Sequence, residues 1–134
     1  MLQKGIITKT SNNSIEQTYL QLRTALSNNP NLKIIAELDH QANAASKGLE
    51  LNPTKIIMFG NPNLGTPLMQ SAQTTGLDLP QKILVYQTED GMVKVSYNDP
   101  LYLKERHGIE DKDEILIKIS GALDKLTGVA IAEK

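Results

Sequence analysis

Two histidines, His40 and His107, are the side chains of this sequence best suited to acid–base chemistry or metal binding near neutral pH. Each lies at the end of an expected element, where functional residues often gather. Asp39, Asp99 or Glu105 could complete a zinc or iron site with them, which would make the protein a metal-dependent enzyme. The alternative is two separate polar caps. We predict no shared metal site, because no metal-binding spacing such as His-Glu-x-x-His occurs.

A second candidate site is the turn in which Gly60, Gly65 and Thr66 have the spacing of a phosphate-binding loop. The lysine of that motif is missing and Pro67 stands where its magnesium-binding hydroxyl should be, so a nucleoside triphosphatase is not expected. A junction of this kind can still present backbone N–H groups to a small anion, although its glycines can also simply shape a tight turn. Gly60 would end a buried strand there, and valine at this position is expected to destabilise the fold by about 2 kcal/mol or more.

Motifs for nucleophilic catalysis are absent, since no Gly-x-Ser-x-Gly elbow occurs, and the sequence assigns neither a catalytic residue nor a cofactor. Polar, turn-forming residues instead concentrate at the ends of expected strands. This placement predicts a small-ligand-binding or anion-binding protein, with the metal-dependent enzyme and a structural protein-interaction module as alternatives. The predicted ligand-binding residues are His40, Phe59, Asn61, Gly65, Thr66, Tyr97 and Asn98.

Local patterns predict the elements that must position these residues. Alternating or β-branched apolar runs predict strands over 5–10, 32–38, 55–59, 82–88 and 92–97. Helical spacing and capping residues predict helices over 15–27, 41–47, 67–73 and 101–107, and a last helix that Asp111 and Glu114 begin as a capping box. Asp90-Gly91 is typical of a hairpin turn between antiparallel strands. Strand 55–59 is apolar throughout and is expected to be the most central.

This order of elements predicts a single α+β domain over 1–134, with a mixed sheet of about five strands and helices mainly on one face. Hydrophobic residues make up 40% of the chain, which is enough for a core. Because Ile56, Ile57 and Met58 are apolar on both sides of their strand, the uncovered sheet face needs a partner. We therefore expect a homodimer.

Charge and composition exclude several classes of partner. The chain has 14 Lys plus Arg, 15 Asp plus Glu and no Cys, which excludes a disulfide scaffold and a thiolate site. Basic residues do not cluster, so no nucleic-acid partner is expected. No apolar run reaches the roughly 18 residues of a membrane span and no signal-peptide core is present, so we expect a cytoplasmic protein that does not bind membranes.

Several short motifs together resemble the domain-of-unknown-function family 302. They include Phe59-Gly60-Asn61-Pro62, Gly65-Thr66-Pro67-Leu68-Met69, Leu79-Pro80, Val85-Tyr86, Asp90-Gly91 and Tyr97-Asn98-Asp99-Pro100, together with Asp39-His40 and Arg106-His107. The resemblance covers nearly the whole chain. It implies a small α+β domain of bacteria and archaea that is similar to proteins forming homodimers, and it carries no established activity.

Overall fold

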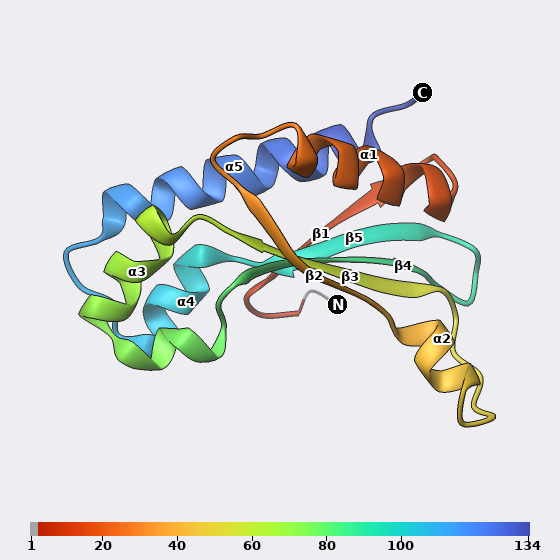
Figure 1. Ribbon diagram of the computed structural model, residues 1–134, viewed down its shortest axis with the longest axis horizontal. Helices are drawn as coiled ribbons and strands as arrows, with labels where there is room; N and C mark the ends of the chain where they lie inside the picture. Colours follow the sequence, from red (N-terminus) through yellow and green to blue (C-terminus); the bar gives the residue numbers. More distant parts are fainter. Residues whose placement is uncertain (1–2) are drawn as a thin grey trace.

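The computed structural model describes residues 3–134, in which strands and helices build one sheet with helices against it (Figure 1). The strands are β1 (Ile6–Ser11), β2 (Lys33–Asp39), β3 (Thr54–Gly60), β4 (Gln81–Gln87) and β5 (Val93–Asn98). The helices are α1 (Ile15–Ser27), α2 (His40–Ala45), α3 (Pro62–Ser71), α4 (Pro100–His107) and α5 (Asp113–Ile131), with a 3₁₀ helix η1 (Gln73–Leu77). No helix within residues 3–134 is both long and apolar enough to cross a membrane.

The sheet has the strand order β1-β5-β4-β3-β2, and every neighbouring pair is antiparallel. The predicted α+β class is confirmed, although the sheet is antiparallel throughout rather than mixed. The expectation that 55–59 is the most central strand is wrong, because β4 occupies the middle and β3 lies between β4 and β2. An apolar run indicates burial, and β3 and β4 are each paired with a strand on both sides and each contain buried residues, so this pattern does not distinguish the two positions.

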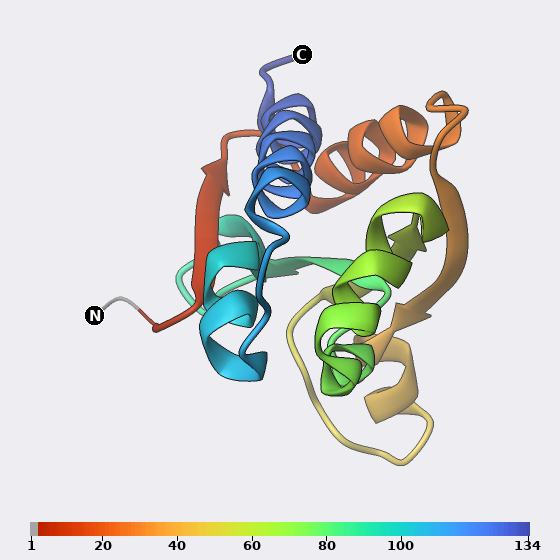
Figure 2. The same ribbon diagram turned by 90° about the vertical axis from the view of Figure 1, so that its left-hand side faces the viewer.

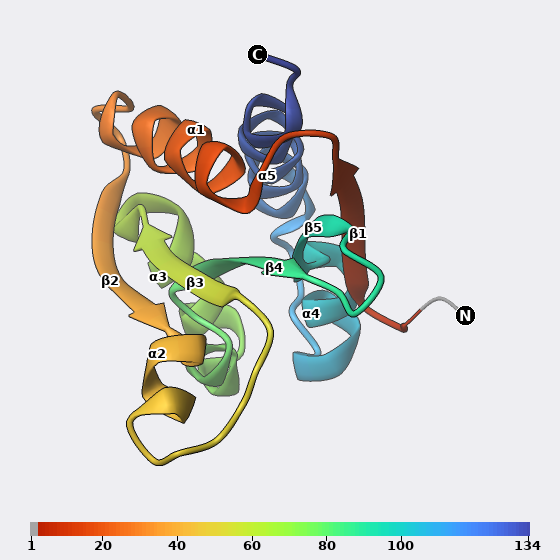
Figure 3. The same cartoon turned by 90° about the vertical axis from the view of Figure 1, so that its right-hand side faces the viewer.

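Helices α1 and α5 pack together on one face of the sheet and bury the hydrophobic core (Figures 1 and 3). Leu22 from α1 and Leu116 from α5 are fully buried there, as are Ile57, Ile83 and Val95 from three adjacent strands. Each such side chain contributes roughly 1.5–3 kcal/mol through its removal from water. In this arrangement α5 packs over β1 and β5, and α1 packs over β4 and β2.

The opposite face of the sheet carries no helix layer across its middle (Figure 3). Strand register places one row of side chains across this face, consisting of Thr8, Ser96, Leu84, Ile56 and Leu38. We call this row and its neighbours the open face. Hydroxyl groups bond along it, because Ser96 Oγ lies 2.8 Å from Thr8 Oγ1 and 2.8 Å from the hydroxyl of Tyr86. The helices are therefore mainly on one face, as predicted.

Two helix starts show how far local capping signals determine the boundaries. Helix α1 begins as predicted, with Ser14 Oγ accepting a hydrogen bond from the backbone N–H of Gln17 at 3.1 Å. The capping box predicted at Asp111 and Glu114 is wrong, because α5 begins at Asp113 without a side-chain cap. Asp111 instead adopts a positive φ of 58°, which places it in the turn before the helix.

Candidate functional site

A groove of about 390 Å³ lies where α3, the segment from η1 to β4 and the ends of β2 and β3 meet helix α5. Helix α3 and helix α4 stand at the same end of the sheet, and α3 is the one beside β2 and β3 (Figure 2). Most of the groove's lining is aliphatic. The apolar residues that line it are Leu32, Ile35, Phe59, Pro62, Leu64, Met69, Leu79, Pro80, Ile119, Ala122 and Leu123.

Helix α3 forms one wall of the groove, and it begins earlier in the chain than expected. The helix was expected to begin at Pro67, but it begins at Pro62, and Pro67 lies inside it. Pro62 has the φ of a first helical residue, and Asn61 before it supplies the cap. Asn61 Oδ1 accepts a hydrogen bond from Asn63 N–H at 3.0 Å. The glycine at position 65 therefore stands on a helix rather than in a loop.

The first-turn donors of α3 are already used within the chain. The Asn61 carbonyl accepts from the N–H of Leu64 at 2.9 Å and from that of Gly65 at 3.0 Å. Pro62 has no N–H, and the N–H of Asn63 is held by the Asn61 side chain. This local geometry favours a structural cap over the backbone anion site that the glycine spacing allowed.

A β-bulge in β2 shapes the mouth of the groove. The register shifts between Ile34 and Ala36, so Ile35 has no partner in the β2–β3 pairing. Its side chain lines the groove although 56% of the residue is exposed to solvent. Bulges re-aim side chains in this way and occur beside functional sites.

Gly60 lies at the same mouth, and the expectation that it needs a glycine backbone is wrong. Its φ is not positive, and a Cβ added there would lie 3.7 Å from Pro80 Cβ and 3.8 Å from Ile35 Cδ1, which is ordinary van der Waals contact. The strand passes directly into the cap of α3 without a strained turn. A larger side chain at this position would enter the groove.

Four of the predicted ligand-binding residues line the groove, namely Phe59, Asn61, Gly65 and Thr66. Tyr97 and Asn98 do not. Strand register places Tyr97 on the core face beside Ile83, where the residue is 6% exposed and burial raises its pKa. Asn98 follows it on the other face of β5, opposite Ile6 at the edge strand.

The two histidines lie at opposite ends of the molecule, because His40 begins α2 and His107 ends α4 (Figure 1). This placement agrees with the prediction that they do not share a site. His107 is held on both sides of its ring, with Nε2 2.5 Å from Asp78 Oδ2 and Nδ1 2.9 Å from Thr74 Oγ1. Its side chain is only 4% exposed, so both nitrogens are occupied and shielded. Within residues 3–134, no three His, Asp or Glu side chains are grouped as metal ligands.

The order hydroxyl, imidazole, carboxylate in Thr74, His107 and Asp78 resembles the arrangement of hydrolase triads. None of the three residues lines the groove. Arg106 also donates from Nη1 to both carboxylate oxygens of Asp78, each at 3.1 Å. Arg106 and His107 thus both connect α4 to Asp78, the residue that follows η1. We assign this cluster a structural role.

The groove residues that the sequence did not indicate come from distant parts of the chain. Ile35, Leu79, Ile119 and Ala122 all belong to stretches with ordinary apolar patterns. One signal was present: Ala122 lies beside Ser120-Gly121 in the last helix, and small residues suggest close approach by another element. The bulge at Ile35 has no comparable sequence signature.

The same fold occurs in a solved structure, described as an uncharacterized conserved protein DUF302 from Bacillus stearothermophilus. The two chains superpose with a TM-score of 0.82 at 20% sequence identity, and the match covers 96% of this chain and 99% of the other. At this level of identity, the similarity establishes a shared fold.

Curated relatives match part of their length to this chain. A protein named "Fluoride-specific ion channel FluC 1" from Brucella suis biovar 1 (strain 1330) is 36% identical over 118 residues, which are 88% of this chain and 46% of the relative. A protein of the same name from Brucella abortus biovar 1 (strain 9-941) is also 36% identical, with 43% of its length covered. The chain thus spans less than half of each of these relatives.

The family described as "Domain of unknown function DUF302" matches residues 7–126, which include all strand residues except Ile6, the whole groove and most of α5. This range confirms the family that the sequence motifs suggested. The chain belongs to the DUF302 family.

Proposed function

We propose that this protein binds a small, largely apolar molecule in the groove between α3, α5 and the ends of β2 and β3. The observation that carries this proposal is the groove itself, about 390 Å³ in volume and lined mainly by aliphatic side chains. Small-molecule sites are concave, mostly apolar and roughly 300–1,000 Å³ in size, with a few polar groups that orient the ligand. Asn61, Thr66 and Gln81 supply such groups here.

An inorganic anion is a less suitable ligand for this site. The N–H groups at the start of α3 bond to Asn61, so the helix terminus offers few free donors to an anion. The fluoride named in the Brucella relatives belongs to proteins of which this chain spans less than half. We therefore do not extend fluoride transport to this chain.

We further propose that the protein works as a homodimer joined through the open face. This face carries Leu38, Ile56, Met58 and Leu84 on neighbouring strands, and Leu38 is 42% exposed. Apolar side chains on a sheet face are stabilised when they are removed from water. Helices α1 and α5 do this on one face, and a second copy of the chain would do it on the open face. Stable interfaces bury about 1,200–2,000 Å² in total, and we expect a value in that range.

Titration with Nile red, a neutral dye that fluoresces in apolar surroundings, tests the groove directly. Ala122 is exposed on α5 and lines the groove, so Ala122→Phe should fill it without disturbing the core. Ala45→Phe adds the same side chain to exposed α2 at the other end of the sheet and serves as the matched control.

We expect saturable dye binding to the wild type and to Ala45→Phe, and binding at least tenfold weaker to Ala122→Phe. Circular dichroism and the melting temperature should show that both variants are folded. Equal dye affinity of folded Ala122→Phe and wild type would overturn the proposal, as would the absence of saturable binding to the wild type.

A further inference from the structure

We infer that the ligand of the groove is a linear aliphatic carboxylate whose head group binds Lys33. This inference rests on the proposed function, because it names the chemical class of ligand for the same site. It is carried by three features of the groove: an apolar floor, a mouth with one unpaired cation, and walls that suit a flexible chain better than a flat ring.

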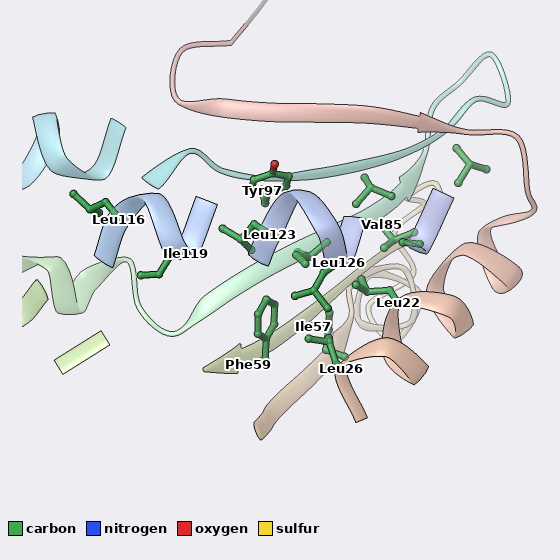
Figure 4. Close-up of a cluster of buried hydrophobic side chains, with 14 of the residues drawn as sticks. Leu22, Leu26, Ile57, Phe59, Val85, Tyr97, Leu116, Ile119, Leu123 and Leu126 are labelled. Atoms are coloured by element: carbon green, nitrogen blue, oxygen red, sulfur yellow. The ribbon is translucent and has the colours of Figure 1, made fainter. Parts of the chain in front are cut away.

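The floor of the groove is apolar, and its side chains are almost fully buried. Phe59, Ile119 and Leu123 line it, and their exposures are 3%, 5% and 1%. Figure 4 shows the Phe59 ring rising from β3 toward α5, the helix that carries Ile119 and Leu123. A polar group placed against these side chains would lose its water without gaining a hydrogen bond, so this end suits a hydrocarbon tail.

A positively charged residue, Lys33, lines the groove and is exposed to solvent. Lys33 is the one charged residue among the described lining residues, and neither aspartate nor glutamate lines the groove. Across residues 3–134, no carboxylate lies within ion-pair distance of the Lys33 ammonium. A lysine stem can pack along apolar surface while its ammonium stays in water, which places a positive charge where a ligand head group would emerge. A carboxylate head group carries the charge opposite to that of the Lys33 ammonium.

The walls suit an aliphatic chain. Phe59 is the one aromatic side chain among the described lining residues, so the groove offers no pair of rings between which a flat ligand would stack. Leu64, Met69 and Leu79 contribute flexible or branched surfaces instead. The bulged Ile35, which is 56% exposed beside Lys33, would be covered by the first methylenes of such a chain.

Isothermal titration calorimetry with octanoate, decanoate and 1-decanol separates the contribution of the tail from that of the head group. Each buried methylene is expected to tighten binding about fourfold, so decanoate should bind roughly fifteenfold tighter than octanoate. A half-exposed ion pair should give decanoate an advantage of about fivefold over 1-decanol, and added salt should reduce that advantage.

Variants of Lys33 test whether this residue binds the carboxylate head group. Lys33→Met should remove the preference for decanoate over 1-decanol and leave 1-decanol binding unchanged, whereas Lys33→Arg should retain the preference. Lys47→Met removes an exposed lysine outside the groove and is the matched control, for which we expect wild-type binding of both ligands.

The outcomes distinguish this inference from the proposed function. If 1-decanol and decanoate bind wild type and Lys33→Met equally well, the carboxylate inference is overturned while the apolar site stands. If neither ligand binds at concentrations below micelle formation, the inference and the proposed apolar site both fail. If Lys47→Met also lost the preference for decanoate over 1-decanol, the assignment of the head group to Lys33 would be overturned.

Discussion

His107 Nε2 lies 2.5 Å from Asp78 Oδ2, and this contact ties the end of α4 to the segment that follows η1. That segment continues into Leu79 and Pro80, which form one wall of the groove. Thr74, within η1, bonds to the other nitrogen of the same ring at 2.9 Å. The buried His107 imidazole therefore bonds to two residues, Thr74 and Asp78, in the segment that leads into this groove wall.

Replacement of His107 by alanine is expected to lower the free energy of unfolding by about 1–3 kcal/mol, because Asp78 and Thr74 lose their common partner and a small cavity forms. Urea denaturation measures this loss. Arg106→Ala removes a neighbouring pair with Asp78 whose arginine is 50% exposed, and it should cost less than about 1 kcal/mol. A His107→Ala variant as stable as the wild type would contradict the role of this tie.

Gly5 and Gly48 both adopt a positive φ, 76° and 72°, but they differ in their surroundings. A Cβ on Gly5 would overlap the Tyr102 ring, whereas a Cβ on Gly48 would meet no atom within 4 Å. Gly48→Ala should cost about 1–2 kcal/mol for the backbone conformation alone. Gly5→Ala should cost about 1–3 kcal/mol more, because the ring must move. Thermal unfolding of the two variants compares them, and equal losses would show that the ring moves freely.

Tyr19 should ionise only in strongly alkaline solution. Burial raises its pKa first, and its hydrogen bond to Glu37 Oε1 at 2.7 Å raises it further, since tyrosinate would face a carboxylate. Because the folded pKa exceeds the unfolded value of about 10, the associated stability is present below pH 10 and is lost as pH rises through the folded pKa.

Absorbance at 295 nm during an alkaline titration follows tyrosine ionisation. Among the four tyrosines of the chain, the Tyr19→Phe variant should lack one of the transitions that occur above pH 10. The variant keeps the ring beside the Lys55 ammonium, which lies 5.1 Å from the ring centroid in the wild type. If Tyr19→Phe instead removes a transition near pH 10, the hydrogen bond to Glu37 does not hold the phenol in solution.

Light scattering at micromolar concentration tests the homodimer, for which we expect twice the chain mass of 14.7 kDa. Leu84→Glu places a charge in the middle of the open face and should give a monomer. Leu20→Glu, on a residue of α1 that is 56% exposed, is the control and should remain dimeric. A wild-type mass of 14.7 kDa, or dissociation by Leu20→Glu alone, would contradict an interface on the open face.

Local signals predicted much of the fold because they act within a few residues. Ser14 caps α1, Gly91 adopts a φ of 85° in the predicted hairpin, and Gly108 ends α4 with a φ of 71°. The start of α3 was wrongly predicted at Pro67, because proline commonly occupies a first helical turn and both Pro62 and Pro67 fit that rule. Asn61 decided between them through its bond to Asn63.

The candidate site was only half predictable, since part of it depends on contacts between distant residues. Phe59 and Asn61 were indicated because the site begins where their strand ends. Leu32, Ile35 and Leu123 reach the same groove through the strand order and the placement of α5, which no local pattern specifies. Tyr97 had a comparable signal at a strand end, but its position in the strand turned it toward the core.

Amide chemical shifts of ¹⁵N-labelled protein titrated with 1-decanol test the central claim most directly, because they locate the ligand residue by residue. We predict that the largest shifts occur at the groove amides of Gly60, Gly65 and Gly76, with little change at Thr8 and Ser96 on the open face. Shifts concentrated at Thr8 and Ser96, or no saturable shifts at the groove glycines, would contradict the claim that this groove is the ligand site.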